Sequence, residues 1–266
     1  MLLNNVFLKS IRDQRRSLLW WSLGISLYCS SITLLYNMMK DSLEEVVMAY
    51  PNDLAKVFGM EDISEMATPA GWLNGEMYSM VLPICFIIFA VFCGANSIAL
   101  EEEKRTIEIL LSEPISRTKL FFEKYFSFLF NVFFIALVIW LSVSICSSLI
   151  DMNLAVSRIF AATLHLTLIS GSFGVLSFTI AACTGRRSKS IIIPVILALI
   201  SYITNIANNF VDGLAPINKL SIFQYYDTAG AFNYGVDLAT TLSFSIMIIC
   251  LTIFGYVKFT KRDLQI

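Results

Sequence analysis

Hydrophobic residues along this chain gather in six long runs that contain no Asp, Glu, Lys or Arg. A helix needs about 20 apolar residues to cross about 30 Å of hydrocarbon. A charged side chain at the middle of a membrane costs at least about 2.5–3.5 kcal/mol, so such runs favour a lipid environment. The pattern predicts six transmembrane helices in one all-α domain that covers residues 1–266. The runs span residues 17–37, 77–99, 125–149, 159–183, 191–207 and 238–257.

Composition agrees with a membrane protein. The chain is 57% hydrophobic and only 15% charged, whereas a soluble domain is about 25% charged. The net charge is −1, and no stripe of Lys and Arg indicates a nucleic-acid partner. The lipid bilayer is therefore the expected surrounding of most of the chain.

The positions of the 19 Lys and Arg residues predict an orientation. With the N-terminus in the cytoplasm, the outer segments hold only Lys40, Lys56, Arg158 and Lys219. Cytoplasmic loops carry the excess of Lys and Arg in most membrane proteins. Both termini and residues 101–124 are therefore expected in the cytoplasm.

Two flanking segments suggest contact with the membrane surface. In residues 1–16, Leu3, Phe7 and Ile11 share one helical face while the basic residues take other faces, which predicts an amphipathic interfacial helix. The alternative is a plain cytoplasmic extension of the first span. Residues 208–237 are rich in Phe and Tyr, which predicts a segment that dips into the outer interface between spans five and six.

Residues 101–124 form a charged segment between the second and third spans. Ile107, Leu110 and Leu111 share one helical face, Pro114 ends that helix, and Ser116 can cap the next one. The pattern indicates a short stiff helix joined to two spans. It either transmits force from a cytoplasmic partner or merely caps the bundle.

This segment, EEEKRTIEILLSEPISRTKLFFEKY, resembles the signature of type-2 ABC transporter permeases. In that family, acidic residues precede Gly-Thr, a Leu-rich helix, Ser-x-Pro-(Val/Ile)-Ser-Arg and a Lys that opens the next span. Arg105 replaces the usual Gly. YPNDLAKVFG and LSIFQYY are similar to the branch that includes proposed antibiotic and multidrug exporters, with Ile222 where Pro is usual. The matching residues are Glu101, Glu102, Glu103, Thr106, Leu110, Leu111, Ser112, Pro114, Ile115, Ser116, Arg117 and Lys124.

The resemblance implies the membrane subunit of an exporter in the cytoplasmic membrane of a prokaryote. Two ATPase subunits would bind ATP and Mg, and a second permease chain, identical or paralogous, would complete a dimer. The charged segment would hold the coupling helix that docks on the ATPase. The implied coupling residues are Glu101, Glu102, Glu103, Lys104, Arg105, Thr106, Leu110 and Arg117.

Motifs for catalysis are missing from the sequence. None of the twelve glycines is followed by Lys and then Ser or Thr, so the chain has no P-loop to bind ATP. The six cysteines lie in apolar runs without a CxxC pair, which argues against a metal site. We expect no enzyme activity, cofactor or metal in this chain by itself.

The neutral spans indicate an amphiphilic or apolar cargo, such as a drug, an antimicrobial peptide or a lipid. His165, the one histidine, and Asn131 are candidates for cargo contact because polar residues inside a membrane are often functional. The alternative is that both simply pack between helices. Two other functions remain open: a scaffold or sensor that recruits a partner without transport, and a lipid-modifying enzyme that uses His165 and a serine.

Overall fold

The computed structural model describes residues 6–262 except residues 50, 52, 59, 61, 105–115 and 212. Every regular element in the described part is a helix. Six helices are long and apolar enough to cross a membrane, which confirms the predicted all-α class with six spans. They are α1 (Val6–Met48), α4 (Val81–Glu103), α6 (Arg117–Leu149), α7 (Val156–Thr184), α8 (Arg187–Ala207) and α11 (Leu238–Lys261).

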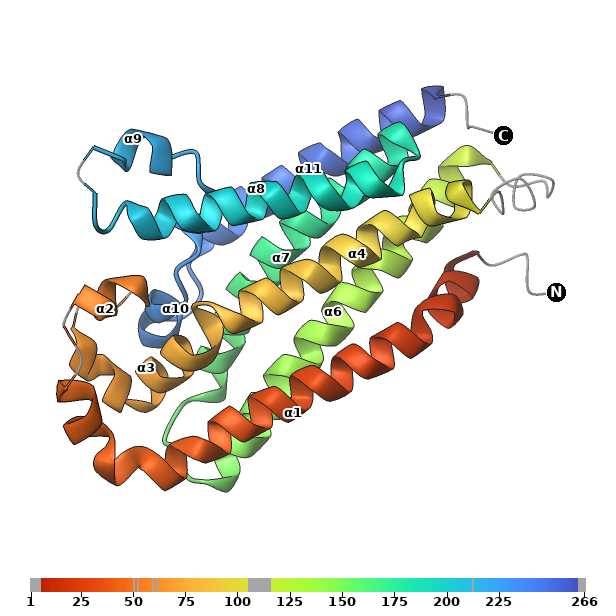
Figure 1. The fold of residues 1–266 in the computed structure, drawn as a ribbon. Helices are drawn as coiled ribbons and strands as arrows, with labels where there is room; N and C mark the ends of the chain where they lie inside the picture. Colours follow the sequence, from red (N-terminus) through yellow and green to blue (C-terminus); the bar gives the residue numbers. More distant parts are fainter. Residues whose placement is uncertain are drawn as a thin grey trace.

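Short helices gather at the end of the bundle opposite both termini (Figure 1). They connect α1 to α4 and α8 to α11, and they bury Phe223 and Phe232 against the long helices. Whether residues 208–237 enter the membrane interface stays a prediction. The short helices are α2 (Asp53–Val57), η1 (Ile63–Ala67), α3 (Pro69–Leu73), η2 (Asn74–Tyr78), α9 (Ala215–Asn218), η3 (Ile222–Tyr225) and α10 (Thr228–Tyr234).

The first long helix has no break at residue 16, where the sequence suggested a boundary. Residues 6–16 continue directly into the first span as part of α1. Their apolar side packs on α6, with the rings of Phe7 and Phe130 edge to face at 6.3 Å between centroids. The structure thus joins this amphipathic stretch to the span, and its position in the lipid interface stays a prediction.

The most buried span is α7, and α4 packs closely along it. Gly94 of α4 faces the backbone carbonyl of Gly174 of α7, and a Cβ on Gly174 would lie only 2.9 Å from the Cβ of Ala90. Membrane helices have little hydrophobic drive to associate, so small residues that permit close van der Waals contact stabilise such pairs. Gly174 therefore supplies a close contact between α7 and α4.

An alanine scan of two glycines tests this contact. Gly94→Ala places a Cβ against the α7 backbone, and overpacking of this kind costs about 1–3 kcal/mol. Gly171→Ala, on α7, is the control because its Cβ would meet nothing within 4 Å. We expect the thermal unfolding midpoint in detergent to fall for Gly94→Ala and to stay level or rise for Gly171→Ala. Equal midpoints for the two variants would contradict the close packing.

Candidate coupling site at the charged end of the bundle

Both termini lie at one end of the bundle, together with the ends of α4 and α6 that flank residues 105–115 (Figure 1). Charged side chains from α1, α4, α6 and α11 meet there. We call Lys9, Glu101, Glu102, Arg117, Lys124 and Arg262 the ionic cluster.

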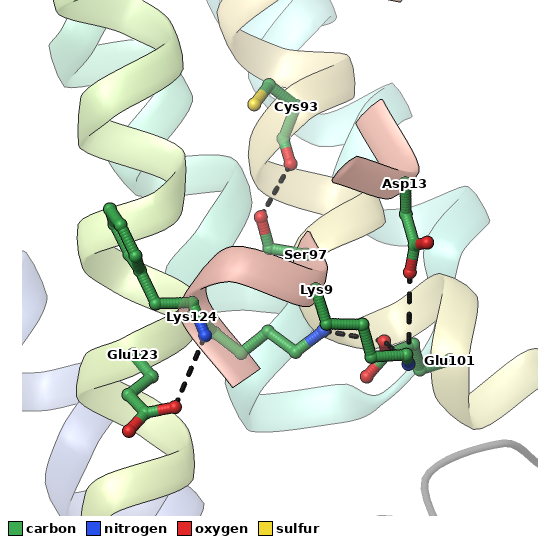
Figure 2. A network of polar contacts seen from close by, with 8 residues as sticks. Lys9, Asp13, Cys93, Ser97, Glu101, Glu123 and Lys124 are labelled. Carbon is green, nitrogen blue, oxygen red and sulfur yellow. Dashed lines mark hydrogen bonds and ion pairs between the residues drawn. The ribbon is translucent and has the colours of Figure 1, made fainter. Parts of the chain in front are cut away.

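Glu101 is the first acidic centre of the ionic cluster. Its Oε1 lies 2.6 Å from Nζ of Lys124 on α6 and 3.2 Å from Nζ of Lys9 on α1. Figure 2 shows Lys9 and Glu101 facing each other across the two helices. The side chain of Lys124 is only 4% exposed, and a buried charge is tolerated when it is paired and hydrogen-bonded. Glu101 thereby connects α4 to both α1 and α6.

Glu102 is the second acidic centre, and it faces the C-terminal end of α11. Its carboxylate accepts a hydrogen bond from Nη2 of Arg262. Nη1 of Arg117, the first residue of α6, donates to the carbonyl oxygen of Arg262 at 2.6 Å. The ends of α4, α6 and α11 are therefore bound together through one arginine.

Gly185 makes room for this second centre. It ends α7 in the left-handed conformation, with φ of 64°, a conformation that glycine adopts without steric cost. A Cβ at this position would clash with the Glu102 carboxylate and lie 2.6 Å from Nη1 of Arg262. The α7 end thus packs directly against the ionic cluster.

The remaining long helix, α8, joins the same end through a hydrogen bond instead of an ion pair. Nε of Arg187, at the start of α8, donates to Oδ1 of Asn96 on α4 at 2.8 Å. Polar or charged contacts at this end consequently join α1, α4, α6, α8 and α11, and the end of α7 packs against Glu102. Motion of the α4 end cannot occur without changing contacts to several neighbours.

The predicted coupling residues divide into three groups. Glu101, Glu102 and Arg117 bond within the chain, as described above. Glu103 and Lys104 are exposed. Arg105, Thr106 and Leu110 lie outside the described residues, as does the predicted coupling helix itself.

Sequence reasoning did not identify Lys9 and Arg262 as members of the ionic cluster. Lys9 is 92 residues from Glu101, and Arg262 is 160 residues from Glu102. The one available signal was the placement of these basic residues at the ends of apolar runs, on the side where the acidic triplet also lies. That placement indicates a shared end of the bundle but not which charges pair.

The two candidates for cargo contact occupy different surroundings. His165 is 2% exposed, and its Nδ1 lies 3.0 Å from the carbonyl oxygen of Asp227. Asn131 donates to Oε1 of Gln14 at 2.8 Å and lines a cavity of about 390 Å³ beside the ionic cluster. The structure therefore places Asn131 at a cavity, and cargo contact by either residue stays a prediction.

A scan against protein families gives one match that covers nearly the whole chain. The model described as "ABC-2 family transporter protein" matches residues 4–264. The chain belongs to this ABC-2 transporter family. It is thus the membrane subunit of an ABC transporter, a permease component that associates with an ABC ATPase and is not itself catalytic. No curated protein matches the chain.

Neighbouring glutamates of this permease allow a matched test of the ionic cluster. Glu102→Gln removes the charge that faces Arg262, and loss of a buried charged partner costs about 1–3 kcal/mol. Glu103→Gln changes an exposed carboxylate one position away and should be nearly neutral. Thermal unfolding in detergent should therefore shift down only for Glu102→Gln. Identical shifts in both variants would show that the Glu102 contacts contribute nothing to stability.

Proposed function

We propose that this permease exports an amphiphilic or apolar cargo and that the ionic cluster couples its helices to a separate ATPase. Two ATPase subunits, which bind ATP and Mg, would dock on the segment 101–124, and a second permease chain would complete the transporter. The observation that carries the proposal is that the ion pairs at the ends of α4 and α6 reach α1 and α11. The docking segment connects the end of α4 to the start of α6.

The geometry supports a mechanical role for the ionic cluster. Force applied to residues 105–115 enters the bundle through the end of α4 and the start of α6. Glu101 passes displacement to α1 through Lys9, and Glu102 passes it to α11 through Arg262. Because packed helices shift as units between discrete arrangements, short ion pairs at their ends favour a joint movement of several spans.

This arrangement changes the roles proposed for the coupling residues. Glu101, Glu102 and Arg117 act as transmitting residues, since their polar atoms bond to other helices of the same chain. Glu103 and Lys104 are exposed and can meet the ATPase directly. We assign the remaining contact to Arg105, Thr106 and Leu110, which follow them in sequence.

The orientation and cargo complete the proposal. Most Lys and Arg residues lie at the end that carries the ionic cluster, which favours the cytoplasmic side of a prokaryotic membrane for this end and for both termini. The spans carry no charged residue in their central parts. A pathway without fixed charge suits an amphiphilic or apolar cargo, and the resemblance to drug exporters supports outward transport.

Two pairs of substitutions that separate force transmission from ATPase docking test the proposed function. Glu101→Gln combined with Glu102→Gln should leave the ATPase bound during co-purification. ATP-driven movement of a fluorescent phospholipid or a cationic dye in inverted vesicles should fall at least about tenfold, equivalent to 1.4 kcal/mol. Glu103→Gln with Lys104→Gln is the control for docking and should weaken ATPase binding. Loss of the ATPase from the first pair would contradict the transmitting role, and wild-type vesicles that move neither probe would favour a scaffold.

Cysteine labelling tests the orientation. The six native cysteines are first replaced, and single cysteines are introduced as Ser116→Cys at the charged end and Asn233→Cys at the opposite end. Both positions are exposed. An impermeant maleimide applied to intact cells should label Asn233→Cys and spare Ser116→Cys. The reverse pattern would place the ionic cluster outside and refute the proposed orientation.

A further inference from the structure

A crevice separates α1 from α4. Among the described residues, α1 packs on α6 and α4 packs on α7, whereas the backbones of α1 and α4 stay apart. Side chains cross between these two helices at Lys9 and Glu101, at Gln14 and Cys93, and at Trp21 and Phe89. Figure 1 shows α6 lying behind the two helices. One cavity of about 390 Å³ opens between them at the charged end, and a second of about 390 Å³ follows farther along α1. Trp21 lines both cavities, and its ring packs on Phe89 of α4 with 5.7 Å between centroids, so the two cavities are neighbours that meet at this aromatic contact. We call the two cavities together the crevice.

Two residues that line the cavity at the charged end carry buried polar atoms without a hydrogen-bond partner in the described part of the chain. Ser10 is 3% exposed and Asn131 is 1% exposed. Ser10 Oγ and Asn131 Oδ1 have no hydrogen-bond partner in the described part of the chain. Leaving a buried polar atom unpaired costs about 1–3 kcal/mol. Both residues line the cavity, so a polar group bound there lies beside them.

The charges around this cavity favour an anionic group. Lys9, Lys104 and Lys124 line it, against Asp13 and Glu101. The same end of the bundle carries Arg12, Arg15 and Arg16, near the start of α1. Basic segments beside a membrane attract anionic lipid headgroups by about 1 kcal/mol for each Lys or Arg.

The rest of the crevice is apolar. Phe89 and Phe92 line its charged-end part beyond the polar residues, and Ile25, Tyr28 and Leu82 line its second part. The α1 residues that line it run from Lys9 to Tyr28. At 1.5 Å per residue they cover about 28 Å. A ligand that fills the crevice therefore has one polar end and a long apolar body.

We propose that the crevice between α1 and α4 binds a phospholipid with an anionic headgroup. The phosphate lies near Lys9, Lys104 and Ser10, a headgroup hydroxyl donates to Oδ1 of Asn131, and an acyl chain follows Trp21 toward Tyr28. This lipid site goes beyond the transport function, because it requires only that the charged end lies at a membrane surface.

Gly24 offers a way to close the crevice without damage to the fold. It lines the apolar part, and a Cβ built on it meets nothing within 4 Å. Glycine is also among the least favourable residues inside a helix. Gly24→Phe should therefore fold and place a ring where the acyl chain would lie. Leu27→Phe, at a residue of α1 that is 72% exposed, is the matched control.

Native mass spectrometry measures the bound lipid directly. The chain is reconstituted in vesicles that contain phosphatidylglycerol and phosphatidylcholine, extracted in mild detergent and weighed. We expect one phosphatidylglycerol for each wild-type chain, at least about tenfold lower occupancy for Gly24→Phe, and wild-type occupancy for Leu27→Phe. Lys104→Gln should reduce the preference for phosphatidylglycerol over phosphatidylcholine.

Two outcomes would overturn the lipid site. The first is equal lipid occupancy in Gly24→Phe and Leu27→Phe, because the crevice would then not hold the chain. The second is displacement of the lipid by millimolar glycerol 1-phosphate, which would show that only an anion is recognised. Both results are independent of ATP-driven transport, so failure here leaves the proposed function intact.

Discussion

Two glutamates at the end of a membrane helix require cations close by. The side chains of Glu101 and Glu102 are 13% and 3% exposed, and a carboxylate removed from water is costly unless an opposite charge and hydrogen bonds compensate. Three other helices supply Lys9, Lys124 and Arg262. The need to pair two buried charges therefore fixes how the ends of α1, α4, α6 and α11 sit relative to one another.

The remaining structure follows from this end and from the α4–α7 contact. Gly94 and Gly174 let α4 and α7 approach closely. Van der Waals packing therefore holds the centre of the bundle together without ion pairs inside the hydrocarbon. α1 is held to α6 and, at its first turns, to Glu101. Since the backbones of α1 and α4 stay apart and only side chains bridge them, a crevice remains with polar groups at the charged end and aromatic rings beyond. The same ion pairs thus support both the coupling proposal and the mouth of the lipid site.

The spans could be predicted from the sequence because charged side chains are costly within lipid. Runs such as 125–149 contain none. Pairing across the cluster was not predictable. Lys9 and Arg262 are far from the glutamates in sequence, and only the packing of α1 and α11 brings them near. Likewise, the sequence treated His165 and Asn131 alike, whereas packing sets His165 against a backbone carbonyl and leaves Asn131 at a cavity.

The central claim is that the ionic cluster holds the ends of several spans as one unit. Pulsed electron spin resonance between labels at Arg12→Cys and Lys261→Cys, both exposed positions on α1 and α11, measures this directly. We expect one narrow distance distribution for the otherwise unchanged chain and a clearly broader one after Glu101→Gln and Glu102→Gln are added. A distribution that is equally wide with and without the two glutamates would contradict the account.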